Sequence, residues 1–115
     1  MSNVFVVYSH YDDKSFNSSI KNTFVKRAEE KGHIVDVVDL YKIKFDPVFS
    51  GQEPDNEVLD HRKRIEKCDV IVLIAPIWNF RMPAILEGWI DKVLAPPWAF
   101  NFKKLIGNYG YPLGN

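Results

Sequence analysis

The segment of residues 69–75 is apolar at every position after Asp69. A strand with apolar residues on both faces must be covered on both, and parallel sheets flanked by helices provide that cover. Two more runs, residues 3–9 and 34–40, are rich in β-branched residues and are typical of strands. The three runs together predict the strands of one buried parallel sheet.

Three segments with helical spacing alternate with these runs. In the first segment, apolar residues four positions apart form one stripe: Phe16, Ile20, Phe24 and Ala28. Ser15 is suited to cap the N-terminus of this helix, and Gly32 is suited to end it. We therefore expect a helix that begins after Ser15 and packs along its apolar stripe.

The second and third helical segments differ in charge. Residues 56–67 are highly charged, and a few positions there are expected to face inward: Val58, Leu59, Ile65 and the adjoining Cys68. The third segment follows Pro83, which suits the first turn of a helix. Its apolar residues form a wide stripe: Ile85, Leu86, Trp89, Ile90, Val93 and Leu94. Both segments are predicted to be helices that pack against the sheet.

The order strand–helix, repeated three times, defines the fold class as α/β. Such alternation predicts a parallel sheet with right-handed crossovers and helices on both faces. In the small doubly wound arrangement the first strand lies between the other two, which gives the strand order 2-1-3. Residues 41–55 contain two prolines and a glycine and are expected to form a loop. The last twenty residues show no clear periodicity.

Composition and charge narrow the possible functions. The chain has 115 residues, which is a single-domain length, and fifteen basic against fifteen acidic side chains leave no surplus for nucleic acid. One cysteine cannot form an internal disulfide, and the three histidines show no metal-ligand spacing. The start is not signal-like, and no apolar stretch approaches the ~18 residues of a membrane span. We expect a cytoplasmic protein without a metal, a nucleic-acid partner or an integral membrane segment.

The charged helix contains a cluster of basic residues: His61, Arg62, Lys63, Arg64 and Lys67. The cluster could bind a phosphate or a lipid head group. Acidic residues share the same segment, however, so a solvated helix face is the expected arrangement. Cys68 precedes the apolar strand and is expected to be a small core residue rather than a reactive thiolate.

Ligands of open α/β sheets bind beyond the carboxyl ends of the strands, where the strand order reverses. The loops at residues 9–17 and 76–82 meet that condition. The first loop ends at a helix N-terminus, whose free N–H groups and dipole attract phosphate. His10, Ser15 and Asn17 could add donors, although no glycine-rich nucleotide motif is present. A capped helix with a polar loop is the other interpretation.

The second loop has two aromatic side chains around an amide, since Trp78 and Phe80 flank Asn79 shortly after the apolar strand. Such a loop could hold a flat heterocycle against its backbone amides and a ring edge. The same aromatic residues could instead pack under a neighbouring loop. The residues alone leave both interpretations open.

The stretch of residues 75–94 resembles the NAD(P)H:quinone oxidoreductase family, which includes DT-diaphorase and belongs to the flavodoxin-like flavoproteins. The resemblance extends to His10 and to the triplet Ser15, Phe16 and Asn17 in the first loop. It also includes residues 39–41 and 98–100, and so covers nearly the whole chain. The element Pro-Ile-Trp-Asn-Phe is similar to the flavin-wrapping loop of azoreductases.

The resemblance implies a two-electron reductase with FAD or FMN as its cofactor. Such enzymes pass hydride from NADH or NADPH to the flavin and then to a quinone-like acceptor. By this resemblance, the residues around the flavin phosphates are His10, Ser15, Phe16 and Asn17. Those against the isoalloxazine ring are Pro76, Ile77, Trp78, Asn79 and Phe80. Phe100 and Phe102 match residues that border the substrate pocket, often across a dimer interface, so a homodimer is expected.

The family pattern continues beyond what this chain supplies. A flavodoxin-like sheet has five strands, and only three are expected here, so residues 1–115 would form a truncated flavin-binding domain without the C-terminal strands. The family's Gly-Gly loop and its Tyr and His residues that assist hydride transfer have no counterpart, so no catalytic residue is assigned. Two other functions stay open: a non-catalytic regulatory or binding module, and an inactive fragment. An apolar third strand would then be an exposed edge, which favours association.

Overall fold

The computed structural model describes residues 1–104 and 110–114. Its elements follow the chain in the order β1 (Asn3–Tyr8), α1 (Phe16–Glu30), β2 (Ile34–Asp39), α2 (Asn56–Lys67), β3 (Val70–Ile74), α3 (Ala84–Val93), β4 (Phe100–Lys104) and β5 (Gly110–Gly114). The first six elements are the three βα units that the sequence predicts, and α2 has the predicted bounds. Strands β4 and β5 are an addition that no sequence pattern indicated.

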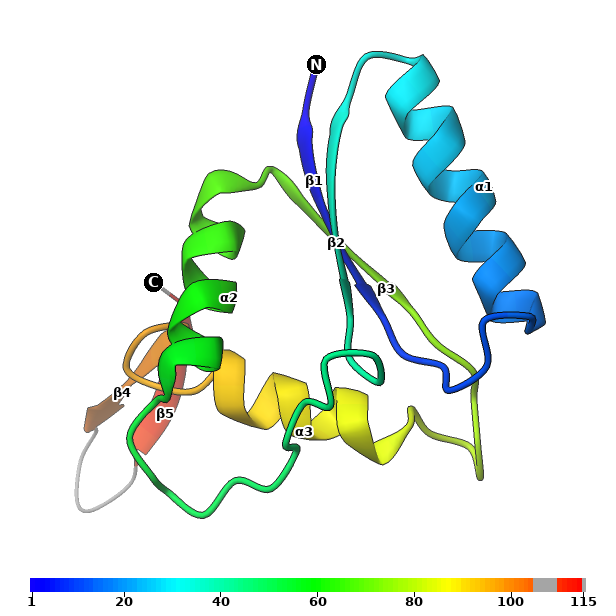
Figure 1. Ribbon diagram of the computed structural model, residues 1–115. Helices are drawn as coiled ribbons and strands as arrows, with labels where there is room; N and C mark the ends of the chain where they lie inside the picture. The colour runs from blue at the N-terminus through cyan, green and yellow to red at the C-terminus, as the bar shows by residue number, and fades with distance from the viewer. Residues whose placement is uncertain (105–109, 115) are drawn as a thin grey trace.

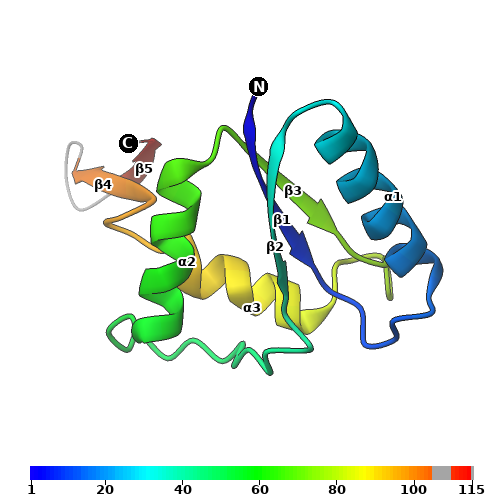
Figure 2. The ribbon, with the colours of Figure 1, turned by 45° about the horizontal axis from the view of Figure 1, so that its top comes forward.

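Strand β1 lies at the centre of a three-stranded parallel sheet of order β2-β1-β3 (Figure 1). It pairs with β2 along its whole length, from Asn3 opposite Ile34 to Tyr8 opposite Asp39. Helix α1 lies on one side of the sheet, whereas α2 and α3 lie on the other (Figure 2). The predicted fold class, strand order and placement of helices on both faces are confirmed.

Successive side chains of β1 point to opposite faces of the sheet and build two separate cores. Val4, Val6 and Tyr8 are buried together with Ile74, and Phe24 of α1 packs against them. The second core contains Phe5, Val7 and residues from both other helices: Val58, Leu86, Trp89 and Val93. Trp89 is fully buried there, as the apolar stripe of α3 predicts.

Helix α1 begins and ends as predicted. The Ser15 hydroxyl accepts a hydrogen bond from the Ser18 N–H at 3.0 Å, and Gly32 follows the helix with a φ of +87°. The predicted apolar stripe is only partly correct, because Ala28 is buried while Phe16 is 70% exposed. Ile20 is exposed as well. Periodicity identifies one face of a helix, but it does not show where the sheet beneath that face ends.

The expectation that β3 is buried on both faces is wrong for the part of the chain that the structure describes. Val70, Ile71 and Leu73 are exposed, and only Ile74 at the end of the strand is buried. Strand β3 pairs with β1 on one side, and no described strand pairs with its other side. An apolar strand with an open edge is a place where chains associate.

Helix α2 corrects the expectation of a solvated basic face. His61 is fully buried and Arg62 is nearly so, whereas Leu59, which was expected to face inward, is exposed. Arg64 is partly buried, and its guanidinium donates to both carboxylate oxygens of Asp36 at 2.7 and 2.8 Å. The remaining members of the cluster are exposed as expected: Lys63 and Lys67.

The buried position of His61 depends on partners from other positions. The Trp89 Nε1–H donates to His61 Nδ1 at 2.9 Å, and a carboxylate oxygen of Glu57 lies 2.9 Å from His61 Nε2. The Arg62 Nε–H donates to the Val93 carbonyl oxygen at 2.9 Å. Two of these partners belong to α3, so the polar residues of α2 join the two helices. A pattern within α2 alone cannot reveal such partners.

The structure also bears on the expectations for Cys68, for membrane-spanning segments and for metal ligands. Cys68 is partly buried against the larger core, and burial raises the pKa of its thiol, as befits a core residue. Within residues 1–104 and 110–114, no helix is long and apolar enough to cross a membrane. In those same ranges, no three His, Cys, Asp or Glu side chains gather as metal ligands would.

Strands β4 and β5 pair with each other in antiparallel fashion, and within the described residues neither pairs with the three-stranded sheet. Both views place this hairpin beside α2, near the C-terminal end of α3 (Figures 1 and 2). The loop that precedes α3 lies at the opposite end of that helix. The chain therefore carries its hairpin far from the carboxyl ends of β1 and β3.

The loop of residues 40–55 crosses α3 at a glycine. A side-chain carbon added to Gly88 would overlap the backbone and ring of Pro47. The same loop is held by Lys92, whose ammonium donates to the Asp46 carbonyl oxygen at 2.9 Å. Gly88 thus allows the loop to pack directly on the helix backbone.

The variant Gly88→Ala is expected to lower the free energy of unfolding by about 1–3 kcal/mol, because the new methyl group must push Pro47 away. At an exposed helical site the same change would stabilise the helix by up to ~1 kcal/mol. Thermal unfolding followed by circular dichroism measures the effect, with Asp91→Ala on the exposed side of α3 as the matched control. An unchanged or higher midpoint for Gly88→Ala would contradict this packing.

His61 makes stability depend on pH. Burial lowers the pKa of His61, and the neighbouring Glu57 partly opposes this shift. The His61 Nδ1 atom accepts a hydrogen bond from Trp89, so a proton on Nδ1 would break that bond. As pH falls below the unfolded value of about 6.5, the unfolded chain binds a proton that the folded chain does not, so stability falls by up to ~1.4 kcal/mol per pH unit. Urea unfolding between pH 5 and about 7.5 should show this slope.

The slope should flatten in His61→Gln and persist in His33→Gln, which replaces a histidine outside the buried cluster. An equal slope in wild type and His61→Gln would assign the pH dependence to other groups.

Candidate functional site

The two loops singled out from the sequence meet at the carboxyl ends of β1 and β3. The rings of His10 and Tyr11 stack with centroids 4.7 Å apart. Trp78 from the second loop lies 5.8 Å from the His10 ring and 6.0 Å from the Tyr11 ring. Three aromatic side chains from two loops therefore form one cluster at the point where the strand order reverses.

The N-terminus of α1 borders the first of these loops. The Ser15 hydroxyl accepts a hydrogen bond from the Ser18 N–H at 3.0 Å, and the Tyr8 hydroxyl lies 3.4 Å from it. Within the described part of the chain, no acceptor takes the N–H groups of Phe16 and Asn17. These two donors and the positive end of the helix dipole are suited to an anion such as a phosphate.

His10 lies in the same loop and keeps a further donor. Its Nδ1 accepts a hydrogen bond from the Asp12 N–H at 2.9 Å, so in the neutral ring the proton is on Nε2. That tautomer leaves an N–H at the outer end of the ring. The first loop therefore has an imidazole N–H in addition to the two backbone N–H groups at the start of α1.

The second loop folds into a tight turn from Trp78 to Arg81. These residues exchange backbone hydrogen bonds of 2.9 and 3.1 Å. Asn79 and Phe80 between them have φ values of 52° and 66°, a conformation that suits Asn and strains Phe. Phe80 is fully exposed at the tip, and Ile77 is exposed beside it. Residues held in such strained conformations cluster at ligand-binding and active sites.

Two tyrosines belong to the cluster without having been assigned a role from the sequence. Tyr11 lies between the two loops, and Tyr41 follows β2 with its ring 6.3 Å from that of Tyr11. Burial and the neighbouring Tyr11 raise the pKa of the Tyr41 phenol, so it stays protonated near neutral pH. The ends of adjacent parallel strands lie at one edge, and this rule could have pointed to Tyr41.

Phe100 and Phe102 are not brought to this cluster. Phe100 is the first residue of β4, which lies at the other end of α3 from the second loop in both ribbon views (Figures 1 and 2). Phe102 is in the same strand, and its side chain is outside what the structure describes. Within one chain, these residues and the two loops occupy opposite ends of the molecule.

The donor set and the aromatic cluster fit a ligand with phosphate at one end and a flat ring system at the other. The phosphate would meet the first turn of α1 together with His10. The ring system would lie against the turn of residues 78–81, next to Trp78 and Tyr11. This is a geometry for holding a nucleotide-type cofactor, and flavins have that chemistry.

Comparison with known proteins places the chain in a family of flavodoxin-like proteins. The family model of the flavodoxin-like fold matches residues 2–113. The chain therefore belongs to the flavodoxin-like family. Ribosyldihydronicotinamide dehydrogenase [quinone] from Homo sapiens is 31% identical over 123 residues, covering 85% of this chain and 53% of that protein.

Solved structures extend the comparison. An NAD(P)H:quinone oxidoreductase from Methanothermobacter marburgensis is similar with a TM-score of 0.81 and 28% identity, covering 86% of this chain and 56% of that one. General stress protein 14 from Treponema denticola, in complex with FMN, shares the fold with a TM-score of 0.63 at 23% identity, covering 84% of this chain and 51% of that one. The resemblance to quinone oxidoreductases inferred from the sequence is confirmed. The chain spans about half the length of the relatives it matches.

Phe80→Gly is expected to raise the free energy of unfolding by up to ~1 kcal/mol, because it relieves left-handed strain of about 1–3 kcal/mol and loses no buried surface. Phe80→Ala is the matched control, since it removes the same ring but keeps a residue that disfavours positive φ. Chemical unfolding of both variants measures the difference. A Phe80→Gly variant no more stable than Phe80→Ala would contradict the left-handed conformation of residue 80, and an equal loss of stability in both variants would mean that the ring makes contacts in solution.

Proposed function

We propose that residues 1–115 are a flavin-binding domain of a two-electron NAD(P)H:quinone oxidoreductase. The observation that carries the proposal is the meeting of two loops at the strand-order reversal. One loop presents backbone and imidazole donors at the start of α1, and the other presents an exposed aromatic turn. The relatives named as quinone dehydrogenases support the same activity.

In this proposal the chain's own residues bind and orient the cofactor. The N–H groups of Phe16 and Asn17, with His10, hold the flavin phosphates, while Ser15 keeps the first turn of α1 in place. Pro76, Ile77, Trp78, Asn79 and Phe80 form the surface against the ring system. When bound, the flavin supplies the hydride chemistry between NADH or NADPH and a quinone. The proposal also places the protein in the cytoplasm.

A homodimer completes the proposed site. Phe100 and Phe102 match residues that border the substrate pocket, yet their strand lies far from the loops of the same chain. A second copy could bring its β4 to the loops of the first. The quinone would then bind between the flavin on one chain and the aromatic residues of the other.

Binding of FAD or FMN to the purified chain tests the proposal directly. We expect a shifted visible flavin band that remains after excess flavin is removed. Trp78→Ala should weaken retention by about tenfold or more, since stacking on an aromatic side chain contributes roughly 1–3 kcal/mol. Trp89→Ala, which alters the core, should weaken it less when compared at equal fractions of folded protein.

Failure to retain either flavin, or a greater loss for Trp89→Ala than for Trp78→Ala, would refute the assignment of the second loop. If flavin is retained, oxidation of NADH or NADPH in the presence of a quinone then tests turnover. Flavin retention without turnover would favour a non-catalytic module with the same binding site.

Assembly is tested by light scattering across a range of concentrations, which should show a dimer. Phe100→Ala should raise the KM for quinone with little effect on flavin retention, because Phe100 lies outside the flavin loops. A strict monomer at the highest concentration would rule out a site shared between copies.

A further inference from the structure

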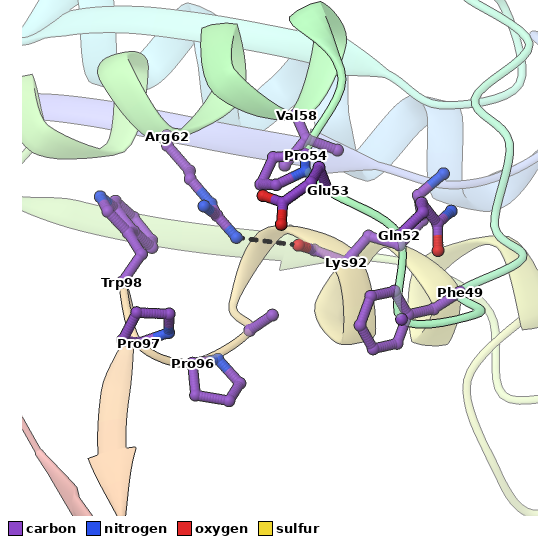
Figure 3. Close-up of a pocket in the computed structure, with 12 residues that line it drawn as sticks. Phe49, Gln52, Glu53, Pro54, Val58, Arg62, Lys92, Pro96, Pro97 and Trp98 are labelled. Atoms are coloured by element: carbon purple, nitrogen blue, oxygen red, sulfur yellow. Dashed lines mark hydrogen bonds between the residues drawn. The ribbon is translucent and has the colours of Figure 1, made fainter.

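A cavity of about 520 Å³ opens between α2, the C-terminal end of α3 and the loop at residues 49–54 (Figure 3). Its volume lies within the range of roughly 300–1,000 Å³ usual for small-molecule sites. Residues 95–98 line the cavity and follow the C-terminal end of α3, whereas the second flavin loop, residues 76–82, precedes the N-terminal end of that helix. The cavity is therefore distinct from the proposed flavin site, and nothing in the proposed function uses it.

The wall of this cavity contains a buried cation, Arg62, a residue that is only 8% exposed. Its Nε–H donates to the Val93 carbonyl at 2.9 Å, and an Nη2–H donates to the Lys92 carbonyl at 3.2 Å. A guanidinium has five N–H donors, so these contacts leave donors available. The central carbon of the guanidinium, Cζ, lies 5.1 Å from the centroid of the Trp98 ring.

The positive charge of Arg62 is only partly balanced by the groups that the structure places around it. Within the described residues, no carboxylate lies within 4.0 Å of its guanidinium, and burial lowers the pKa of Arg62. The carbonyl end of α3 offers only about half an elementary charge. Lys92, the other buried cation in the wall, differs because Asp46 binds it through a carbonyl at 2.9 Å and a carboxylate oxygen at 3.9 Å.

A buried and unpaired charge is unfavourable, whereas the same charge with a hydrogen-bonded anion is tolerated. The remaining surface of the cavity is largely apolar, with Phe49 on one side and Trp98 with two prolines on the other (Figure 3). Glu53 also lines the cavity and adds a negative charge. Arg62 favours a ligand with a negative charge, and Glu53 disfavours a second such charge. The apolar walls favour a ring.

We propose that this cavity binds a small aromatic monocarboxylate. The carboxylate accepts hydrogen bonds from the free N–H groups of Arg62, and the ring lies between Phe49 and Trp98. Charge-assisted bonds of this kind provide affinity and orientation together. Phosphorylated ligands with two charges are disfavoured because Glu53 shares the space.

Isothermal titration of the purified full chain with 2-naphthoate tests the proposal, with 2-naphthamide as the neutral analogue of the same shape. We expect one naphthoate per chain, bound at least about tenfold more tightly than the amide, since a charge-assisted bond replaces a neutral one. Absence of naphthoate binding at millimolar concentration, or equal affinity for both compounds, would overturn the proposal.

Variants locate the binding site. Glu53→Gln removes the repelling charge and should tighten naphthoate binding severalfold, whereas Glu29→Gln on α1 makes the same charge change elsewhere and should leave it unchanged. Arg62→Gln should abolish the preference for naphthoate over the amide. Because Arg62 also holds the end of α3, Phe49→Ala serves as the second variant: the exposed loop residue can be removed without unfolding, and binding should weaken severalfold.

Trp78→Ala separates this cavity from the aromatic cluster of the flavin loops. Naphthoate binding should be the same in Trp78→Ala as in wild type. A loss of binding there, or weaker binding in Glu53→Gln, would place the ligand elsewhere and refute the proposal. The result does not depend on whether the chain retains flavin.

Discussion

The central position of β1 is the constraint on which the rest of the structure depends. It is paired on both edges and buried on both faces, so its side chains divide alternately between the core under α1 and the core under α2 and α3. The carboxyl end of the same strand leads into the loop with His10 and Tyr11. Because adjacent parallel strands end at the same edge, this pairing also brings the loop after β3, with Trp78, to the first loop.

Polar contacts inside the second core determine how α2 and α3 meet. His61 and Arg62 are buried because Trp89 and the last carbonyls of α3 provide their hydrogen-bond partners. These contacts hold the C-terminal end of α3 near α2. They also leave the Arg62 guanidinium in the wall of a cavity, with its positive charge only partly compensated. The packing of α2 against α3 and the proposed ligand site therefore depend on the same residues.

The open edge of β3 and the hairpin of β4 and β5 both bear on how this domain associates with other polypeptide. Apolar residues that a sheet normally covers are exposed at β3, and β4 lies far from the loops that it would serve in one chain. Within the described residues, both features are what the proposed association of two chains would account for. The proposed homodimer supplies a place for β4, whereas the β3 edge, which no described strand covers, has free backbone groups for pairing with an extended chain.

The sequence by itself determined the three βα units, the strand order 2-1-3, the Ser15 cap and the two loops at the strand-order reversal. Period-two and period-four patterns and helix-capping residues are local signals, and parallel topology follows from general rules. Only the tertiary structure decided that His61 and Arg62 are inside, that Leu59 and most of β3 are exposed, and that Tyr11 and Tyr41 join the aromatic cluster. Those outcomes depend on partners distant in the chain, such as Trp89 for His61, and on the extent of the sheet, which no local pattern encodes.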